Sequence, residues 1–230
     1  NTMRVLEGET RPVLTFGVEA GDVHGANLTM DHGFGSFDVI YQGEKYAHLD
    51  LSVPGTHNVK NAIAAAAAAI ALDIPGKAVE DGMRDFRLPG RRFEYKGTYH
   101  GAELCDDYAH HPGELATLFD TAAALGHQRV VCAFQPHTYT RTHELFDDFV
   151  EVLKRPDVTL LAEIFAARED NDIGISSADL AAKIPGSVYC PTLADVTEKL
   201  REIARPGDLL LTVGAGDIYL AGEALVKDAD

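Results

Sequence analysis

The chain has 230 residues, enough for one large domain or for one domain and part of a second. Hydrophobic residues make up 46% of it and charged residues 24%, a composition typical of a soluble globular protein. Thirty-six Asp and Glu against 20 Lys and Arg give a net charge of −16, so neither nucleic acid nor an anionic membrane is an expected partner. The longest apolar run, residues 62–72, is alanine-rich and shorter than the roughly 18 residues that a membrane-spanning helix needs.

The sequence contains three cysteines, Cys105, Cys132 and Cys190, which lie far apart and form no Cys-x-x-Cys pair. We therefore expect neither a disulfide framework nor a zinc knuckle, and interpret each cysteine as a small buried hydrophobic residue. No basic-then-apolar leader is visible, which favours a cytoplasmic protein. The chain begins with Asn1 rather than Met, which suggests that it is trimmed from a longer protein.

Residues 1–89 are predicted to form an incomplete α/β unit in which short antiparallel strands precede two helices. Turns at Gly33, Gly35 and Gln42-Gly43 separate the strands, and Pro54-Gly55 ends them. These elements are too few for a complete α/β domain. The expected strands are 13–18, 26–30, 36–41 and 45–53, and the expected helices are 57–72, with Thr56 as its N-cap, and 77–86.

Residues 90–230 alternate regularly between apolar strands and amphipathic helices. Five strand–helix alternations predict a Rossmann-like, doubly wound parallel sheet, in which ligands bind beyond the carboxyl ends of the strands. The expected strands are 102–105, 129–134, 158–163, 187–190 and 208–213, and the expected helices are 112–125, 142–154, 176–183, 193–204 and 217–226.

The first of these strands leads into Asp106-Asp107-Tyr108-Ala109-His110-His111-Pro112. A carboxylate there can accept hydrogen bonds from ribose hydroxyls, and an imidazole can bind an anion or move a proton. The alternative is a simple turn, with one Asp capping the helix that Pro112 opens. A metal site is a weaker alternative because the spacing resembles no known closed site.

The second strand leads into His137-Thr138-Tyr139-Thr140-Arg141. A cation at a helix start is disfavoured by the helix dipole, so Arg141 there suggests a task such as gripping a carboxylate or phosphate. The alternative is an exposed arginine paired with Glu144 or Asp148. We expect the two histidine-bearing loops to follow adjacent strands and to share a cleft.

Three further stretches carry weaker signals. In residues 54–62, Asn58 and Asn61 share a helix face and could contact an adenine edge, or simply cap the helix. Arg91-Arg92 could clamp a phosphate, or form a solvated hinge. Gly214-Ala215-Gly216-Asp217 could approach a phosphate, but it lacks the third glycine of the dinucleotide fingerprint, so a structural turn is favoured.

Taken together, the stretches PGTHNVKNAIAA, GRRFE, DDYAHHPGE, FQPHTYTRT and GAGDI, which span residues 54–218, resemble the Mur ligase family. The resemblance implies that 1–89 is the carboxy-terminal part of the central ATP-binding domain and that 90–230 is the carboxy-terminal, amino-acid-binding domain. The implied reaction is ATP-dependent joining of L-alanine to UDP-N-acetylmuramic acid through an acyl phosphate, in peptidoglycan synthesis.

The resemblance also implies roles for individual residues. His57 and Asn61 would lie near adenine, Arg92 near the ATP phosphates or ribose, Asp107 at the ribose hydroxyls and Tyr108 beside the nucleotide. The remaining set would face the amino-acid carboxylate and the reaction centre, and consists of His110, His137 and Arg141.

The sequence departs from the family pattern in one important respect. It has no G-x-x-x-x-G-K-[ST] phosphate loop, and the Mg²⁺ ligands and UDP-binding domain of the family are expected in a missing part. We therefore expect the chain to be inactive alone. The alternatives are a non-catalytic module that binds a nucleotide or acidic metabolite, or the related ligase that recycles murein tripeptide. Amino-acid preference among alanine, serine and glycine, and the oligomeric state, are left open.

Overall fold

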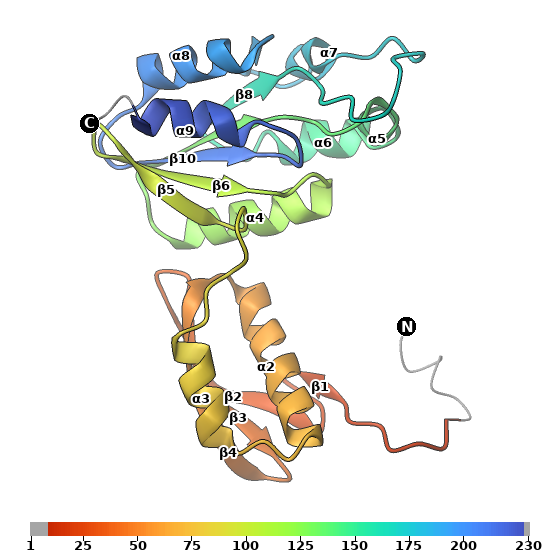
Figure 1. Cartoon of the computed structure of the whole chain (residues 1–230), viewed down its shortest axis with the longest axis vertical. Coiled ribbons are helices and arrows are strands. Elements are labelled where there is room, and N and C mark those ends of the chain that lie inside the picture. Colours follow the sequence, from red (N-terminus) through yellow and green to blue (C-terminus); the bar gives the residue numbers. More distant parts are fainter. Residues whose placement is uncertain (1–8, 228–230) are drawn as a thin grey trace. The chain divides into compact units, whose positions relative to one another are not determined.

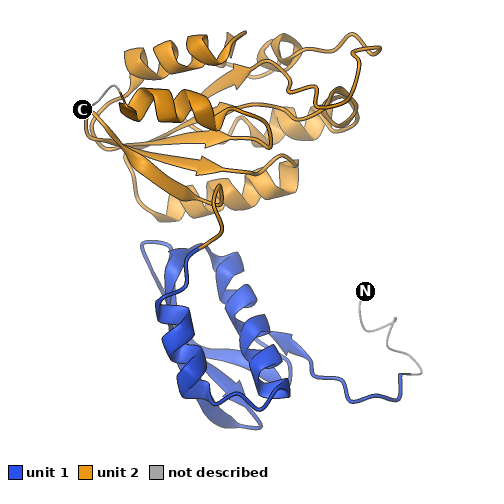
Figure 2. Cartoon of the chain, viewed as in Figure 1, with its two compact units in different colours: residues 1–87 blue, residues 88–230 orange. Residues whose placement is uncertain are grey.

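The computed structural model describes residues 9–227, and they form two compact units, with the division between Arg87 and Leu88 (Figures 1 and 2). The first eight residues of the expected first domain, including the chain start, lie outside the described part. No helix within residues 9–227 is long and apolar enough to cross a membrane. Each unit has a hydrophobic core of its own.

The first unit is a four-stranded sheet with two helices packed against it, as Figure 1 shows. The sheet order is β1-β2-β3-β4, antiparallel except for the β1–β2 pair. Alternate residues of β3 and β4, such as Phe37, Val39 and Leu49, are fully buried beneath the helices, as the period of two requires. The elements are β1 (Phe16–Gly17), β2 (Val23–Asp31), β3 (Phe34–Tyr41), β4 (Glu44–Pro54), α2 (Thr56–Ala71) and α3 (Gly76–Arg84).

The second unit is a six-stranded sheet covered by helices on both faces (Figure 1). Its order is β5-β6-β10-β7-β8-β9, parallel except for β5. The strands are β5 (Glu94–Tyr99), β6 (Ala102–Asp107), β7 (Arg129–Phe134), β8 (Val158–Ala162), β9 (Val188–Cys190) and β10 (Asp208–Val213). The helices are α4 (Pro112–Ala124), α5 (Tyr139–Glu144), α6 (Phe146–Val152), α7 (Ser177–Ala181), α8 (Leu193–Ile203) and α9 (Tyr219–Lys227).

The central strand β10 shows why the sheet needs helices on both sides. Its six residues are all buried. Leu209 and Leu211 pack with α4 and α6, whereas Leu210 packs with α8 and α9, because neighbouring strand residues point to opposite faces. The predicted α/β class, with a doubly wound parallel sheet preceded by antiparallel strands, is confirmed.

Several local predictions were wrong. Thr56 is the first helical residue, and Gly55 is the N-cap because its φ of 105° makes a turn that suits glycine. The expected helix 142–154 is two helices, α5 and α6, interrupted at Leu145. Strand β5 was not predicted, and the predicted strand 13–18 is reduced to two residues. All three cysteines are buried and unpaired, as expected.

Candidate functional site

His110 is presented by the turn that joins β6 to α4. Pro112 opens α4, and the His111 ring caps it by accepting from the Gly113 amide at 3.2 Å. The Glu114 carboxylate completes the cap by accepting from the amides of His110 and His111, at 2.9 and 3.2 Å. His111 is therefore a helix cap, whereas the half-buried His110 has its Nδ1 3.0 Å from the Tyr108 carbonyl and 3.5 Å from Glu114 Oε2.

His137 is held by the segment that follows β8. The Phe165 amide donates to the Pro136 carbonyl and the Thr138 amide to the Phe165 carbonyl, both at 2.9 Å. The Phe165 ring also stacks on the His137 ring, with 5.6 Å between centroids. Backbone and ring contacts together leave the imidazole little freedom to turn. At this turn Thr138 has a φ of 70°, a left-handed backbone conformation that is strained for a β-branched residue.

Arg141 lies one helical turn beyond His137. Its Nη1 donates to His137 Nδ1 and to the His137 carbonyl, each at 3.3 Å. Because a guanidinium cannot accept a hydrogen bond, His137 Nδ1 must be the unprotonated nitrogen, and Nε2 carries the proton when the ring is neutral. No carboxylate forms an ion pair with Arg141 within residues 9–227. The alternative that it pairs with Glu144 or Asp148 is therefore wrong.

The surroundings of His137 favour its neutral form. Burial, followed by the positive charge of Arg141 and the proximity of His110, lowers the pKa of His137 from its usual 6.5, and the Glu169 carboxylate opposes this shift. Glu169 also accepts from the Thr140 amide at 2.9 Å, which steadies the start of α5. At neutral pH the cluster thus combines a neutral imidazole with a guanidinium that has no carboxylate partner within residues 9–227.

The two histidine loops meet at the carboxyl edge of the sheet. The ring centroids of His110 and His137 are 6.1 Å apart. The expectation that their strands are adjacent was wrong, because β10 lies between β6 and β7. The loops still meet, since all three strands are parallel and end at the same edge.

Asp107 and Tyr108 lie beside this cluster, at the tip of β6. The Asp107 carboxylate accepts from the amides of Phe93 and Ala109, both at 2.8 Å. Burial raises the pKa of Asp107, and these two hydrogen bonds partly offset the rise. The Tyr108 ring is 44% exposed and meets the His110 ring edge-on. Arg92 is exposed, and its charge also acts on Asp107.

His57 and Asn61 lie on α2, in the first unit, and both are exposed. Asn58 is buried and donates to the Pro54 carbonyl at 2.7 Å, so it closes the turn rather than facing a ligand. Asn61 donates to the Asn58 side chain at 3.2 Å.

Two arguments made from the sequence need correction. Arg141 is the third of the six residues of α5, so it lies in the last turn as well as the first, and the helix dipole neither favours nor disfavours a cation there. Arg91 is engaged with Asp106 and with the carbonyls of Gly214 and Gly216, so it is not a phosphate clamp. The Gly214–Gly216 stretch is accordingly a structural turn.

Phe165 and Glu169 were missed by the sequence analysis. Phe165 follows the apolar strand β8 and resembles its continuation, while Glu169 is one of 36 acidic residues. Only the tertiary structure, in which both residues contact the His137 loop, distinguishes them from other residues of the same type. Within the described residues, no group of three or more His, Cys, Asp and Glu side chains is placed to hold a metal ion.

Imidazole and guanidinium groups thus gather at the carboxyl edge of a doubly wound α/β sheet, the edge at which such folds bind ligands. Residues 91–216 match the Mur ligase glutamate ligase domain, and residues 1–69 match the Mur ligase middle domain. The chain belongs to the Mur ligase family.

Similar curated proteins are UDP-N-acetylmuramate–L-alanine ligases. That of Clostridium novyi is 42% identical over 94% of this chain and 48% of its own length, and that of Lachnospira eligens is 43% identical over 94% and 48%. The chain thus spans about half the length of these relatives. Among solved structures, UDP-N-acetylmuramate-alanine ligase MurC from Thermotoga maritima matches with a TM-score of 0.77 at 26% identity, over 94% of this chain and 47% of that one.

Proposed function

We propose that this chain is the part of a UDP-N-acetylmuramate–L-alanine ligase that faces the nucleotide and the amino acid. The observation that carries the proposal is the meeting of His110, His137 and Arg141 at one sheet edge, with no carboxylate paired to the guanidinium in residues 9–227. The identity of up to 43% to L-alanine ligases supports the choice of substrate.

The proposed reaction requires charge neutralisation more than covalent work by the protein. ATP supplies a phosphoryl group to the muramoyl carboxylate. The alanine amine then attacks that acyl carbon, a C–N bond forms, and phosphate leaves with the C–O bond electrons. Arg141 would bind the alanine carboxylate, and the His137 Nε2 proton would be donated to an anionic oxygen. Such positioning of opposite charge is the main source of rate in phosphoryl and acyl transfer.

His110 would serve the incoming amine. Its Nδ1 lies 3.0 Å from the Tyr108 carbonyl, which can only accept, so Nδ1 carries a proton. In the neutral ring Nε2 is then an acceptor, suited to hold or remove a proton of the ammonium group. The two imidazoles would thus have opposite roles: His110 Nε2 would accept a proton, and His137 Nε2 would donate one.

Asp107, Tyr108 and Arg92 are the proposed nucleotide contacts of the second unit. Asp107 keeps lone pairs for ribose hydroxyls after accepting from two amides, Tyr108 offers an exposed ring, and Arg92 offers an exposed positive charge. His57 and Asn61 would contact adenine. A solved MurF ligase from Thermotoga maritima in complex with ADP shares the fold, with a TM-score of 0.73.

The described residues do not suit Mg²⁺. Asp106 is bound by Arg91 and Thr212, and Asp107 by two backbone amides. With no phosphate-loop pattern in the sequence, we propose that the chain alone binds substrates without turnover. The same observation favours, as a second candidate, a non-catalytic nucleotide-binding module.

Calorimetry on this chain tests the proposal. We expect L-alanine to bind the unaltered chain and to lose binding in Arg141→Ala, with ATP binding kept in both. Arg155→Ala is the matched control, because Arg155 is a solvent-facing arginine paired with Asp120. No alanine binding by the unaltered chain with ATP binding intact would favour the non-catalytic module. Phosphate release by this chain, given ATP, L-alanine and UDP-N-acetylmuramic acid, would contradict the expected inactivity.

A further inference from the structure

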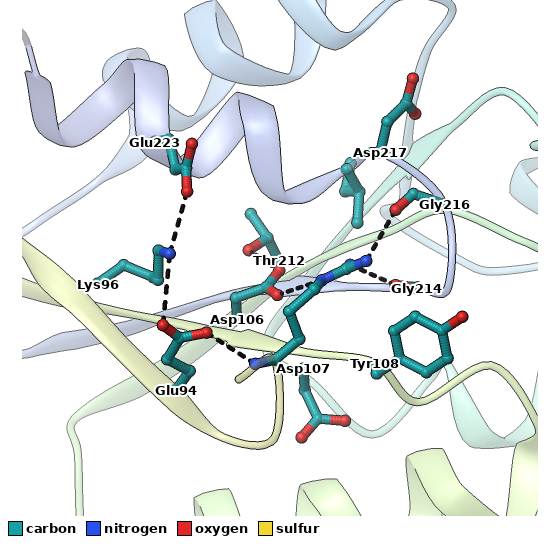
Figure 3. A network of polar contacts seen from close by, with 12 residues as sticks. Glu94, Lys96, Asp106, Asp107, Tyr108, Thr212, Gly214, Gly216, Asp217 and Glu223 are labelled. Carbon is teal, nitrogen blue, oxygen red and sulfur yellow. Dashed lines mark hydrogen bonds and ion pairs between the residues drawn. The ribbon is translucent and has the colours of Figure 1, made fainter. Parts of the chain in front are cut away.

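Arg91 makes more contacts than a linker residue needs. Its Nε donates to Asp106 Oδ2 at 2.8 Å, Nη1 to the Gly216 carbonyl at 2.9 Å and Nη2 to the Gly214 carbonyl at 2.6 Å. The guanidinium also faces the rings of Tyr108 and Tyr219, at 5.1 and 4.6 Å from their centroids. Figure 3 shows the hydrogen bonds of this group as dashed lines, which reach Asp106 on β6 and the two glycines of the turn after β10.

The partner carboxylate is deeply buried. The Asp106 side chain is 1% exposed, and its second oxygen accepts from Thr212 at 2.8 Å. A buried carboxylate needs a compensating cation, and Arg91 is the residue that supplies it. All of these contacts of the guanidinium therefore come from within the second unit.

The backbone around Arg91 is fastened to the same strand tip. The Arg91 carbonyl accepts from the Tyr108 amide at 2.7 Å, and the Phe93 amide donates to Asp107 Oδ2 at 2.8 Å. The Arg91 amide donates to Glu94, which is linked through Lys96 to Glu223 on α9. Residues 91–93 and 107–108 are thus two neighbouring chain segments that hydrogen bonds join at both ends. Arg92 lies between these two hydrogen bonds.

We propose that Arg91 is a positioning residue that holds Arg92, Asp107 and Tyr108 in one fixed group for the nucleotide. This rests on the proposed function for the identity of the ligand, but the positioning itself is a property of the second unit. In the proposed arrangement Arg91 contacts neither substrate nor nucleotide. It acts through the residues whose backbone and rings it holds.

The structure offers a matched control for this idea. Arg129 makes the same kind of buried pair, donating to both oxygens of Asp208 at 3.0 and 2.6 Å and to the Ile203 carbonyl at 2.7 Å. The Asp208 side chain is 3% exposed. Arg129 and Asp208 begin β7 and β10, at the edge opposite the candidate site. A purely structural arginine–aspartate pair should therefore behave like this one.

The test compares Arg91→Lys with Arg129→Lys in the whole chain. Lysine keeps the charge but cannot span Asp106 and two carbonyls at once. We expect both variants to fold and to lose comparable stability, but only Arg91→Lys to shift the amide resonances of residues 107–109. It should also raise the pKa of Asp107 further, since the Phe93 amide no longer steadies the charged carboxylate, and weaken ATP binding roughly tenfold, the loss expected for one hydrogen bond to a charged group.

The outcomes separate this inference from the proposed function. Unchanged resonances and Asp107 pKa in a folded Arg91→Lys would overturn the role of Arg91, whatever the ATP result. Changed resonances with no ATP binding by the unaltered chain would uphold the positioning and contradict the proposed ligand. Should Arg91→Lys not fold, hydrogen exchange on the unaltered chain decides. Protection of the Tyr108 and Phe93 amides equal to that of β6 supports the anchor, and rapid exchange there refutes it.

Discussion

The rings of His110 and His137 lie 6.1 Å apart, centroid to centroid, although strand β10 separates the two strands that carry them. His137 is the more constrained of the two, because the Phe165 ring stacks on its ring and Arg141 bonds to its Nδ1. Its protonation should therefore report on the integrity of the whole cluster.

His137 should make the protein less stable in mild acid. Burial first, and then Arg141 and His110, hold the pKa of His137 below the usual 6.5. Just below pH 6.5 the unfolded chain binds a proton that the folded chain does not, so the free energy of unfolding falls as the pH falls. We expect His137→Gln to lose this part of the dependence in urea unfolding between about pH 7.5 and about pH 5.5. His143→Gln, at an exposed position of α5, should keep it; identical curves for His137→Gln and the unaltered chain would contradict the prediction.

The charges on either side of His137 should move its pKa in opposite directions. Arg141→Gln removes a positive charge and should raise the pKa of His137, whereas Glu169→Gln removes a negative charge and should lower it further. Titration of the ring protons by NMR measures both. Shifts of the same sign would show that loop rearrangement, rather than charge, dominates.

Gly216→Ala should disturb the cluster from a distance. A Cβ at this position would lie 2.3 Å from Gln135 Oε1, which accepts from the Asp217 and Ile218 amides, and 2.6 Å from the Phe165 ring. We expect a loss of roughly 2 kcal/mol or more in the free energy of unfolding, together with a shift of the His137 ring resonances. Gly113→Ala, where the nearest atom is at 3.6 Å, is the control. Equal stability of the two variants would rule out this packing argument.

Gly82→Ala should stabilise the first unit. Gly82 lies inside α3, and a Cβ there meets nothing within 4 Å. Alanine in an exposed helix interior is favoured over glycine by roughly 0.5–1 kcal/mol, which thermal or urea unfolding of this unit can detect. Gly76→Ala should do the reverse, since its Cβ would lie 1.8 Å from the Tyr46 carbonyl oxygen. A stability gain in both variants would be inconsistent with this account.

The regular elements were largely predictable. The bounds of β7 and β10 were predicted without error, because uninterrupted apolar runs between turn residues are typical of buried parallel strands. Strand β5 was not predicted because Glu94 to Tyr99 contains charged residues and Gly97. It is a strand only through its pairing with β6. The break between α5 and α6 was not predicted because Leu145 is not a helix-breaking residue.

The candidate site was predictable in composition and less so in roles. His110, His137, Arg141 and Asp107 could be chosen because polar residues that follow apolar strands must reach the carboxyl edge of a parallel sheet. The sequence could not show that His111 caps a helix while His110 does not, nor that Phe165 and Glu169 return to the His137 loop. Those roles depend on contacts between residues far apart in the chain.

The sequence by itself determined the α/β class, the alternation of strands and helices and the edge of the sheet at which the polar loops gather, because periodicity and strand polarity are local properties. The tertiary structure alone decided between neighbours of the same type. Arg91 and Arg92 are identical side chains one residue apart, yet only Arg91 meets the buried Asp106, and Arg92 is left exposed. The reason is electrostatic: a carboxylate removed from water binds whichever cation the path of the chain brings within reach.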